Sequence, residues 1–104
     1  MNIDARLRAI INEISGHTLV DVGCDHGIVT CAALEEGKVK NAIACDISDK
    51  SLDKARNLAK LKGLSNVEFR CGDGLCVIKD NEADTIVIAG MGGQEIIKIL
   101  SSVP

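Results

Sequence analysis

A glycine-containing turn between two apolar segments is the part of the sequence best suited to hold a small molecule. It runs Asp-Val-Gly-Cys-Asp-His-Gly from Asp21 to Gly27. Glycines at positions 23 and 27 would let the backbone turn tightly and let a ligand or a neighbouring strand approach closely. The spacing is not the G-x-G-x-x-G of dinucleotide sites, and Asp21 and Asp25 would repel a pyrophosphate. The turn therefore favours a cationic ligand.

Two further acidic residues at the ends of later apolar segments suit a nucleoside. Asp46 lies about twenty residues beyond the turn, where an acid can accept hydrogen bonds from ribose hydroxyls; a helix N-terminal role is the alternative. Asp73, between two glycines, could accept from an adenine amino group, or could belong to an ordinary Asp-Gly turn. Together these acids predict S-adenosylmethionine, a nucleoside without phosphate that carries a sulfonium and an ammonium group. The expected cofactor-binding residues are Asp21, Gly23, Cys24, Asp46, Ile47, Asp73 and Gly74.

A second glycine-rich turn follows the most continuous apolar segment of the chain, Ala83–Ala89. Three glycines would leave bare backbone N–H groups beside a flat substrate. A tight turn from a strand into a helix is the alternative. The residues that we assign to the substrate side are Gly90, Met91, Gly92 and Gly93.

The elements that must position these residues alternate along the chain. Apolar segments predict strands, and segments with helical spacing of apolar residues predict helices. We expect strands at residues 18–22, 41–45, 67–71 and 83–89, and helices at residues 3–14, 28–36, 48–62 and 94–101. This alternation predicts an α/β, Rossmann-like fold, with a parallel sheet of strand order 3-2-1-4 and helices on both faces. Ligands of such sheets bind beyond the carboxyl ends of the strands, where both turns fall.

Composition narrows the functions that are open to the chain. Its 104 residues suffice for one domain, with 46% hydrophobic residues and a single aromatic one, Phe69. The core must therefore be aliphatic, and base stacking on this segment is disfavoured. A net charge of −3 gives no overall attraction to phosphate. We find neither an apolar segment of membrane-spanning length nor a signal peptide, and we expect a cytoplasmic location.

The five cysteines form no C-x-x-C pair and leave an odd one unpaired. In a protein without a secretory signal, they are expected to be reduced, mostly buried thiols, and we expect no metal. A zinc site built from Cys24, Cys45, Cys71 and His26 is the alternative.

Three stretches together resemble the bacterial tRNA (adenine-22-N1)-methyltransferases, a family of class I S-adenosylmethionine-dependent enzymes. They are Asp21-Val-Gly-Cys-Asp-His26, Gly72-Asp-Gly-Leu75 and Asp84-Thr-Ile-Val-Ile-Ala-Gly-Met-Gly-Gly93. The resemblance extends from the first helix to Leu100. It implies a Rossmann-like methyltransferase domain, S-adenosylmethionine as the methyl donor and tRNA as the substrate. It also implies that Asp25 and His26 are the catalytic residues; for His26, a role in capping the following helix is the alternative.

The chain departs from the family in two respects. After Asp-His the family usually has alanine, an aromatic or aliphatic residue and then proline, whereas this chain has Gly27-Ile-Val-Thr30. The family also continues with further strands and a helical extension that is thought to help hold tRNA. We therefore interpret residues 1–104 as a single S-adenosylmethionine-binding domain, truncated relative to a seven-stranded methyltransferase. Contacts with tRNA would then lie largely outside this chain.

Truncation would leave the fourth strand at an edge of the sheet. Its run Thr85–Ala89 contains no charged residue or proline, the residues that protect natural edge strands against pairing with another chain. We therefore expect a homodimer, or aggregation, through residues 84–89. Two alternatives to the enzyme stay open: a non-catalytic or weakly active cofactor-binding fragment, and a nucleotide-dependent oxidoreductase domain.

Overall fold

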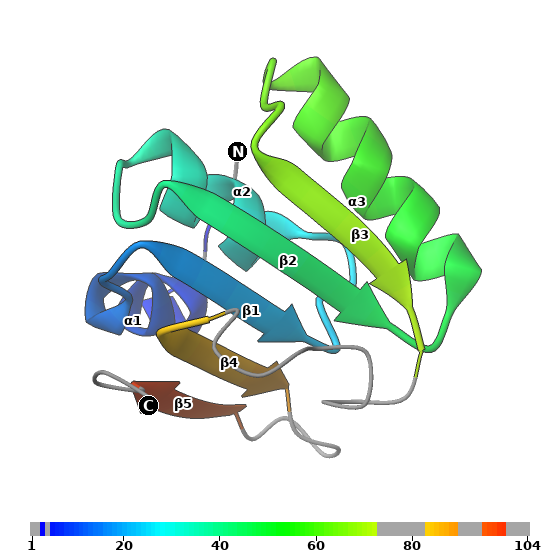
Figure 1. Ribbon diagram of the computed structural model, residues 1–104. Helices are drawn as coiled ribbons and strands as arrows, with labels where there is room; N and C mark the ends of the chain where they lie inside the picture. The colour runs from blue at the N-terminus through cyan, green and yellow to red at the C-terminus, as the bar shows by residue number, and fades with distance from the viewer. Residues whose placement is uncertain (1–2, 4, 73–82, 90–94, 100–104) are drawn as a thin grey trace.

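The computed structural model describes residues 3, 5–72, 83–89 and 95–99. Its helices and strands follow one another from the N-terminus in the order shown in Figure 1. They are α1 Ala5–Glu13, β1 Thr18–Val22, α2 Ile28–Glu35, β2 Asn41–Asp46, α3 Asp49–Leu61, β3 Val67–Cys71, β4 Thr85–Ala89 and β5 Glu95–Ile99.

The strands form one sheet in the order β3-β2-β1-β4-β5. The first four pair in parallel, which confirms the predicted order 3-2-1-4. In the central strand, Val20 lies level with Ile43 of β2 and with Ile86 of β4. The carboxyl ends of β1, β2 and β3 consequently lie side by side at one end of the strands. We call this side of the sheet the carboxyl edge, as distinct from an edge strand.

The end of the chain differs from the prediction. We expected a helix at residues 94–101, but Glu95–Ile99 is a strand that pairs antiparallel with β4 along its whole length. Three of its five residues are isoleucines, whose branched side chains favour strands. Residues 90–94, which connect the two strands, lie outside the described residues. The expectation that residues 84–89 form an exposed edge is therefore wrong, and with it the basis for a homodimer through them.

The described helices all pack against the same face of the sheet, behind it in Figure 1. Residues alternate between the faces along each strand, so Leu19 packs against the helices and Val20 does not. The core between helices and sheet consists of Ile10, Ile14, Leu19, Ala33, Leu34, Val39, Ala42 and Val87, continued by Cys24, Ala44, Leu52 and Ala55. The cluster on the other face consists of Val20, Ile43, Cys45 and Ile86. The described residues therefore supply one of the two helical layers that the fold class predicts.

Helix α3 shows how the sequence specifies an element beside the carboxyl edge. Ser48 caps its N-terminus, because the Ser48 hydroxyl oxygen accepts a hydrogen bond from Ser51 N at 3.2 Å. Leu52, Ala55 and Ala59 form its buried stripe. None of the described helices is long and apolar enough to cross a membrane.

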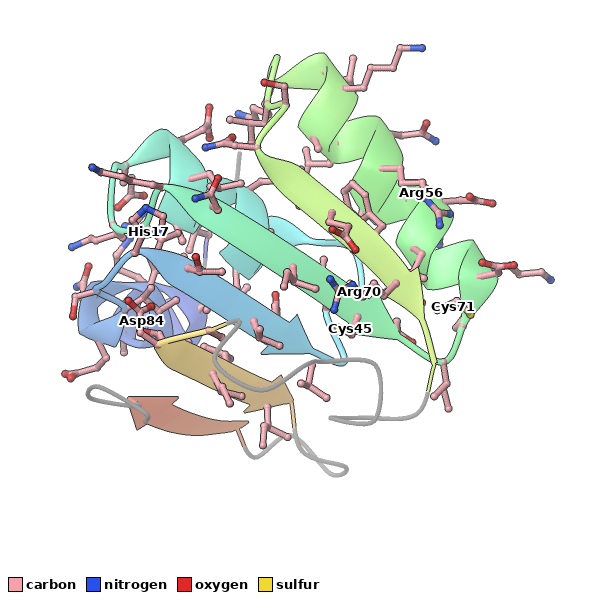
Figure 2. The ribbon with its side chains drawn as sticks, viewed as in Figure 1. His17, Cys45, Arg56, Arg70, Cys71 and Asp84 are labelled. Carbon is pink, nitrogen blue, oxygen red and sulfur yellow. The ribbon has the colours of Figure 1, made fainter. Side chains whose placement is uncertain are left out.

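Asp84 fastens β4 to β1 at the opposite edge of the sheet. Its carboxylate accepts hydrogen bonds from His17 N at 2.7 Å and Thr18 N at 3.0 Å, while Asp84 N donates to Thr18 O. Figure 2 shows His17 and Asp84 close together at this end, far from Cys71 at the end of β3. Asp84 and His17 therefore stabilise the sheet and lie away from the predicted site.

We expect Asp84→Ala to lower the free energy of unfolding by about 1–2 kcal/mol, because two backbone N–H groups lose a charged acceptor. Urea denaturation followed by circular dichroism measures the loss. Asp53→Ala is the matched control, since Asp53 pairs with Arg56 on the exposed face of α3 and should cost less than about 1 kcal/mol. Equal losses in the two variants would contradict a special role for Asp84.

Candidate functional site

The turn after β1 is fixed to the end of β2 by its own backbone. Gly23 N and Cys24 N both donate to Cys45 O, at 2.8 and 2.9 Å, and Gly27 N donates to Cys24 O at 2.9 Å. The turn needs left-handed backbone at Gly23, with φ +72°, and at Asp25, with φ +52°. Asp25 is the one non-glycine residue with positive φ in the described part of the chain. Such conformations in non-glycine residues concentrate at functional sites.

Gly27 begins α2, and its importance lies in packing between helices. Its φ is +78°, and a Cβ built on it would lie 2.7 Å from Ala55 Cβ of α3. The close approach that the sequence suggested is thus made by a neighbouring helix. The tight contact holds the start of α2 beside α3 and so fixes the direction in which the turn leaves the sheet.

Asp46 joins the turn after β1 to the loop after β2. One of its carboxylate oxygens accepts from Asp25 N at 3.1 Å, and the other accepts from Ser48 N at 2.9 Å. Asp46 O also accepts from Gly72 N at 3.0 Å, which brings the end of β3 to the same place. The side chain is only half-buried, and each oxygen keeps a second lone pair for a hydroxyl donor. Asp46 therefore lies at the end of β2 and connects the turn after β1 with the loop after β2.

Asp21 is buried, with an exposed fraction of 2%, on the side of β1 that faces α2. Thr30 Oγ1 of α2 donates to Asp21 Oδ2 at 2.6 Å, which orients the carboxylate. This hydrogen bond holds the carboxyl group of Asp21 in one orientation beneath the turn.

A pocket of about 280 Å³ lies between α1, the turn after β1 and the start of α2. Asp21, Gly23, Cys24, Asp25 and His26 line it from the turn, as do Arg6 and Leu7 from α1. The structure thus brings together five of the predicted site residues around one cavity. Asp46 does not line the pocket but contacts Asp25, which does.

Asp25 and His26 lie at the mouth of this pocket. His26 Nε2 is 3.5 Å from Asp25 Oδ1, and the side chains are 50% and 76% exposed, respectively. Both can therefore be reached by a large substrate. Ile47, next to Asp46, is also exposed, at 73%, so it could be reached by a ligand at the carboxyl edge.

Some of the predicted site residues lie outside the described residues. These are Asp73, Gly74, Gly90, Met91, Gly92 and Gly93.

Sequence reasoning missed Arg6 as a site residue. It stands in the first turn of α1, fifteen positions before the turn that begins at Asp21, and no motif of the sequence includes it. Only the direction in which α1 runs past β1 brings it to the pocket. The sequence offered one signal for Arg6: a cation in the first turn of a helix interacts unfavourably with the helix dipole.

The cysteines at the strand ends do not form a common site. Cys24 packs on the helical face of the sheet, Cys45 packs on the other face, and Cys71 is exposed. Within the described ranges, no group of three His, Cys, Asp or Glu residues could hold a metal ion. Burial, with a smaller contribution from Glu35, raises the pKa of Cys31 to about 11. Burial and the nearby Asp21 raise the pKa of Cys24 well above its usual range.

We expect iodoacetamide at pH 8 to modify Cys71 at least tenfold faster than Cys24, Cys31 or Cys45, because Cys71 is the exposed one of these four described cysteines and thiolates are the reactive form. A Cys76→Ser background leaves one thiol in the tryptic peptide that contains Cys71. Tandem mass spectrometry then gives each rate, because fragmentation separates Cys24 from Cys31 within their shared tryptic peptide. Labelling in 8 M urea is the control, in which the rates should converge. Rapid native labelling of Cys31 would contradict the described packing.

The chain is similar in sequence to known methyltransferases. The family model described as "Methyltransferase domain" matches residues 3–104. A tRNA (adenine(22)-N(1))-methyltransferase of Bacillus subtilis is 39% identical over 104 residues, covering 98% of this chain and 44% of the relative. The chain spans less than half the length of the curated relatives that it matches first.

Solved structures agree with the family match. The tRNA methyltransferase TrmK of B. subtilis superimposes with a TM-score of 0.80 at 39% identity, over 88% of this chain and 40% of that one. TrmK of M. capricolum, in complex with S-adenosyl-homocysteine, gives a TM-score of 0.78 at 28% identity, over 85% and 41% of the two chains. The match of the family model over nearly the whole sequence, together with the parallel sheet and the acidic turn at its carboxyl edge, shows that the chain belongs to the methyltransferase domain family.

Proposed function

We propose that the chain binds S-adenosylmethionine at the carboxyl edge of its sheet and supplies the cofactor-binding part of an enzyme that methylates N1 of adenine-22 in tRNA. The observation that carries the proposal is the acidic pocket beside the turn after β1, with Asp46 anchored next to it. The residues Asp25 and His26 are proposed to act on the substrate at the mouth of that pocket.

The charges of the site fit this cofactor. The described residues that line the pocket include two carboxylates and one guanidinium, at Asp21, Asp25 and Arg6. S-adenosylmethionine carries a sulfonium, an ammonium and a carboxylate, so its net charge of about +1 complements the pocket. Its ribose would lie against Asp46, with the lone pairs described above accepting from the vicinal hydroxyls. The relative from M. capricolum was solved with S-adenosyl-homocysteine, the product form of this cofactor.

The cofactor, when bound, supplies a methyl group that is activated by the adjacent sulfonium. The protein's task is then to hold the accepting nitrogen in line with the methyl carbon and the sulfur. Adenine N1 has its own lone pair and needs no proton removed before it attacks. Asp25 or His26 would accordingly orient the base or accept a proton from its amino group.

The choice of tRNA as the substrate comes from the B. subtilis relative, whose name states that activity. With a net charge of −3, the chain itself offers no overall attraction to RNA. We therefore propose that segments beyond these residues contribute most of the tRNA contacts, and that the protein acts in the cytoplasm.

Isothermal titration with S-adenosylmethionine, S-adenosylhomocysteine and NAD tests the cofactor. We expect both sulfur ligands to bind and NAD to bind at least tenfold more weakly, because two carboxylates face its pyrophosphate. Preference for NAD would instead support the oxidoreductase. A radiolabelled methyl-transfer assay on unmodified tRNA tests the reaction, with tRNA carrying guanine at position 22 as the control. Cofactor binding without methyl transfer would identify the chain as a cofactor-binding fragment.

A further inference from the structure

Helix α3 carries positive charge in a chain whose net charge is −3. It contains four lysine and arginine residues and two aspartates, so its side chains have a net charge of +2. The four cationic residues are all exposed, and they are Lys50, Lys54, Arg56 and Lys60. A local concentration of positive charge can attract phosphate even where the protein as a whole does not.

The lysines of α3 are distributed along its exposed side. Lys50 and Lys54 are four positions apart, so they lie one turn apart on the same helix face. From Lys50 to Lys60 the helix rises about 15 Å, which is the length of roughly four phosphates in one strand of a nucleic-acid helix. We call Lys50, Lys54 and Lys60 the α3 lysines.

The α3 lysines are not neutralised by neighbouring acids. Arg56 of the same helix pairs with Asp53 at 2.8 Å, and its guanidinium lies over the ring of Phe69, 5.7 Å from the centroid. The α3 lysines, by contrast, form no ion pair with any residue that the structure describes. Lysines of this kind can neutralise phosphates and release the counterions that surround a nucleic acid.

The α3 lysines begin at the same side of the sheet as the candidate site. Ser48 caps α3 and donates from its N to the Asp46 carboxylate, and Lys50 follows two positions later. Figure 1 shows α3 alongside β3, with its first turn at the carboxyl edge. A polymer that is held at the carboxyl edge could therefore continue along the exposed side of α3.

We propose that the α3 lysines bind the phosphate backbone of the RNA substrate, on nucleotides near the base that is held at the carboxyl edge. Contacts of this kind orient an RNA without reading its sequence. The inference deepens the proposed function and rests on it, because it assigns a surface of this chain to that substrate. The surface adds to the contacts that we assign to segments beyond these residues.

The salt dependence of tRNA binding tests the inference. Fluorescence anisotropy measures the Kd of the chain for labelled, unmodified tRNA between about 50 and 200 mM NaCl. We expect the double variant Lys50→Gln and Lys54→Gln to bind roughly tenfold more weakly at the lower salt concentration. Its slope of log Kd against log salt should be smaller by about 1.4–1.8, because two phosphate contacts are lost.

The double variant Lys38→Gln and Lys40→Gln is the matched control. It removes the same charge from the loop between α2 and β2, at the amino ends of the strands, and its Kd should stay within about twofold of wild type. Circular dichroism should show that both variants are folded, and both should bind S-adenosylmethionine as the wild-type chain does.

Three results would overturn the inference: no binding of tRNA by the wild-type chain, an unchanged Kd in the α3 variant, or equal weakening in the two variants. In the first case, binding to phosphatidylglycerol vesicles that depends on the α3 lysines would assign this surface to a membrane instead. The cofactor titration tests the proposed function separately, since that function fails if the wild-type chain does not bind S-adenosylmethionine.

Discussion

Replacing Gly27 with alanine should lower the free energy of unfolding by about 2–5 kcal/mol, the largest single-residue effect that we expect in this protein. A left-handed conformation costs a non-glycine residue about 1–2 kcal/mol, and forcing a methyl into a packed contact adds about 1–3 kcal/mol. Both apply to Gly27, whose φ is +78° and whose added Cβ would lie 2.7 Å from Ala55 Cβ. Urea denaturation followed by far-UV circular dichroism measures the effect.

Gly37→Ala is the control for the backbone cost alone. Gly37 has φ +70°, but a Cβ added there meets nothing within 4 Å, so we expect a loss of only about 1–2 kcal/mol. Introducing Ala55→Gly into the Gly27→Ala protein should recover part of the lost free energy of unfolding, because it removes the Ala55 Cβ that the new methyl group would contact. If the two glycine variants lose the same free energy, the contact between α2 and α3 is not as tight as described.

Removing the Asp46 carboxylate should produce the largest effect on the cofactor. We expect Asp46→Ala to weaken S-adenosylmethionine binding by about 1.5–3 kcal/mol, or roughly 10- to 150-fold in Kd. It would remove both the proposed acceptor for the ribose and the acceptor for Asp25 N and Ser48 N, so that the turn after β1 loses one of its contacts with the end of β2. The fold should persist, because the side chain lies outside the core. Isothermal titration measures the affinity.

The neighbouring acid Asp49 provides the control for this prediction. It is exposed in the first turn of α3, and Asp49→Ala removes the same charge close to the site. Its affinity for the cofactor should stay within about twofold of wild type, since screened surface charges contribute little. An Asp46→Ala protein that is folded and binds with unchanged affinity would exclude Asp46 from the site.

The part of the fold that was predicted correctly is the part with strong local signals. The strands β1, β2 and β4 are short, largely apolar runs, β3 alternates apolar with charged residues, and α3 has both a capping serine and an apolar stripe. Their alternation leaves few topologies, because parallel crossovers are right-handed. The sequence also places Asp21, Asp25 and Asp46 at the carboxyl edge, because each lies in or soon after a strand, while their roles toward a ligand stay predictions.

The features that were missed depend on contacts between distant segments. Five residues at positions 95–99 have no period that distinguishes helix from strand, and pairing with β4 decides their conformation. Arg6 joins the pocket only because α1 extends along β1. Likewise, the neighbour that needs Gly27 is Ala55 of a helix that begins more than twenty residues later. Local sequence patterns do not predict such contacts between distant segments.

The register of the central strand also bears on how the protein folds. His17, directly before β1, contacts Asn41 of β2, and 24 positions separate the two residues. Thr18 of β1 contacts Asp84, directly before β4, and 66 positions separate these two. Closing the longer loop costs about 0.9 kcal/mol more in chain entropy. The unit from β1 to β3, which contains the turn, Asp46 and the contact between α2 and α3, should therefore form before β4 joins it. A ribosome-bound chain could accordingly assemble the floor of its cofactor site before the residues of β4 emerge.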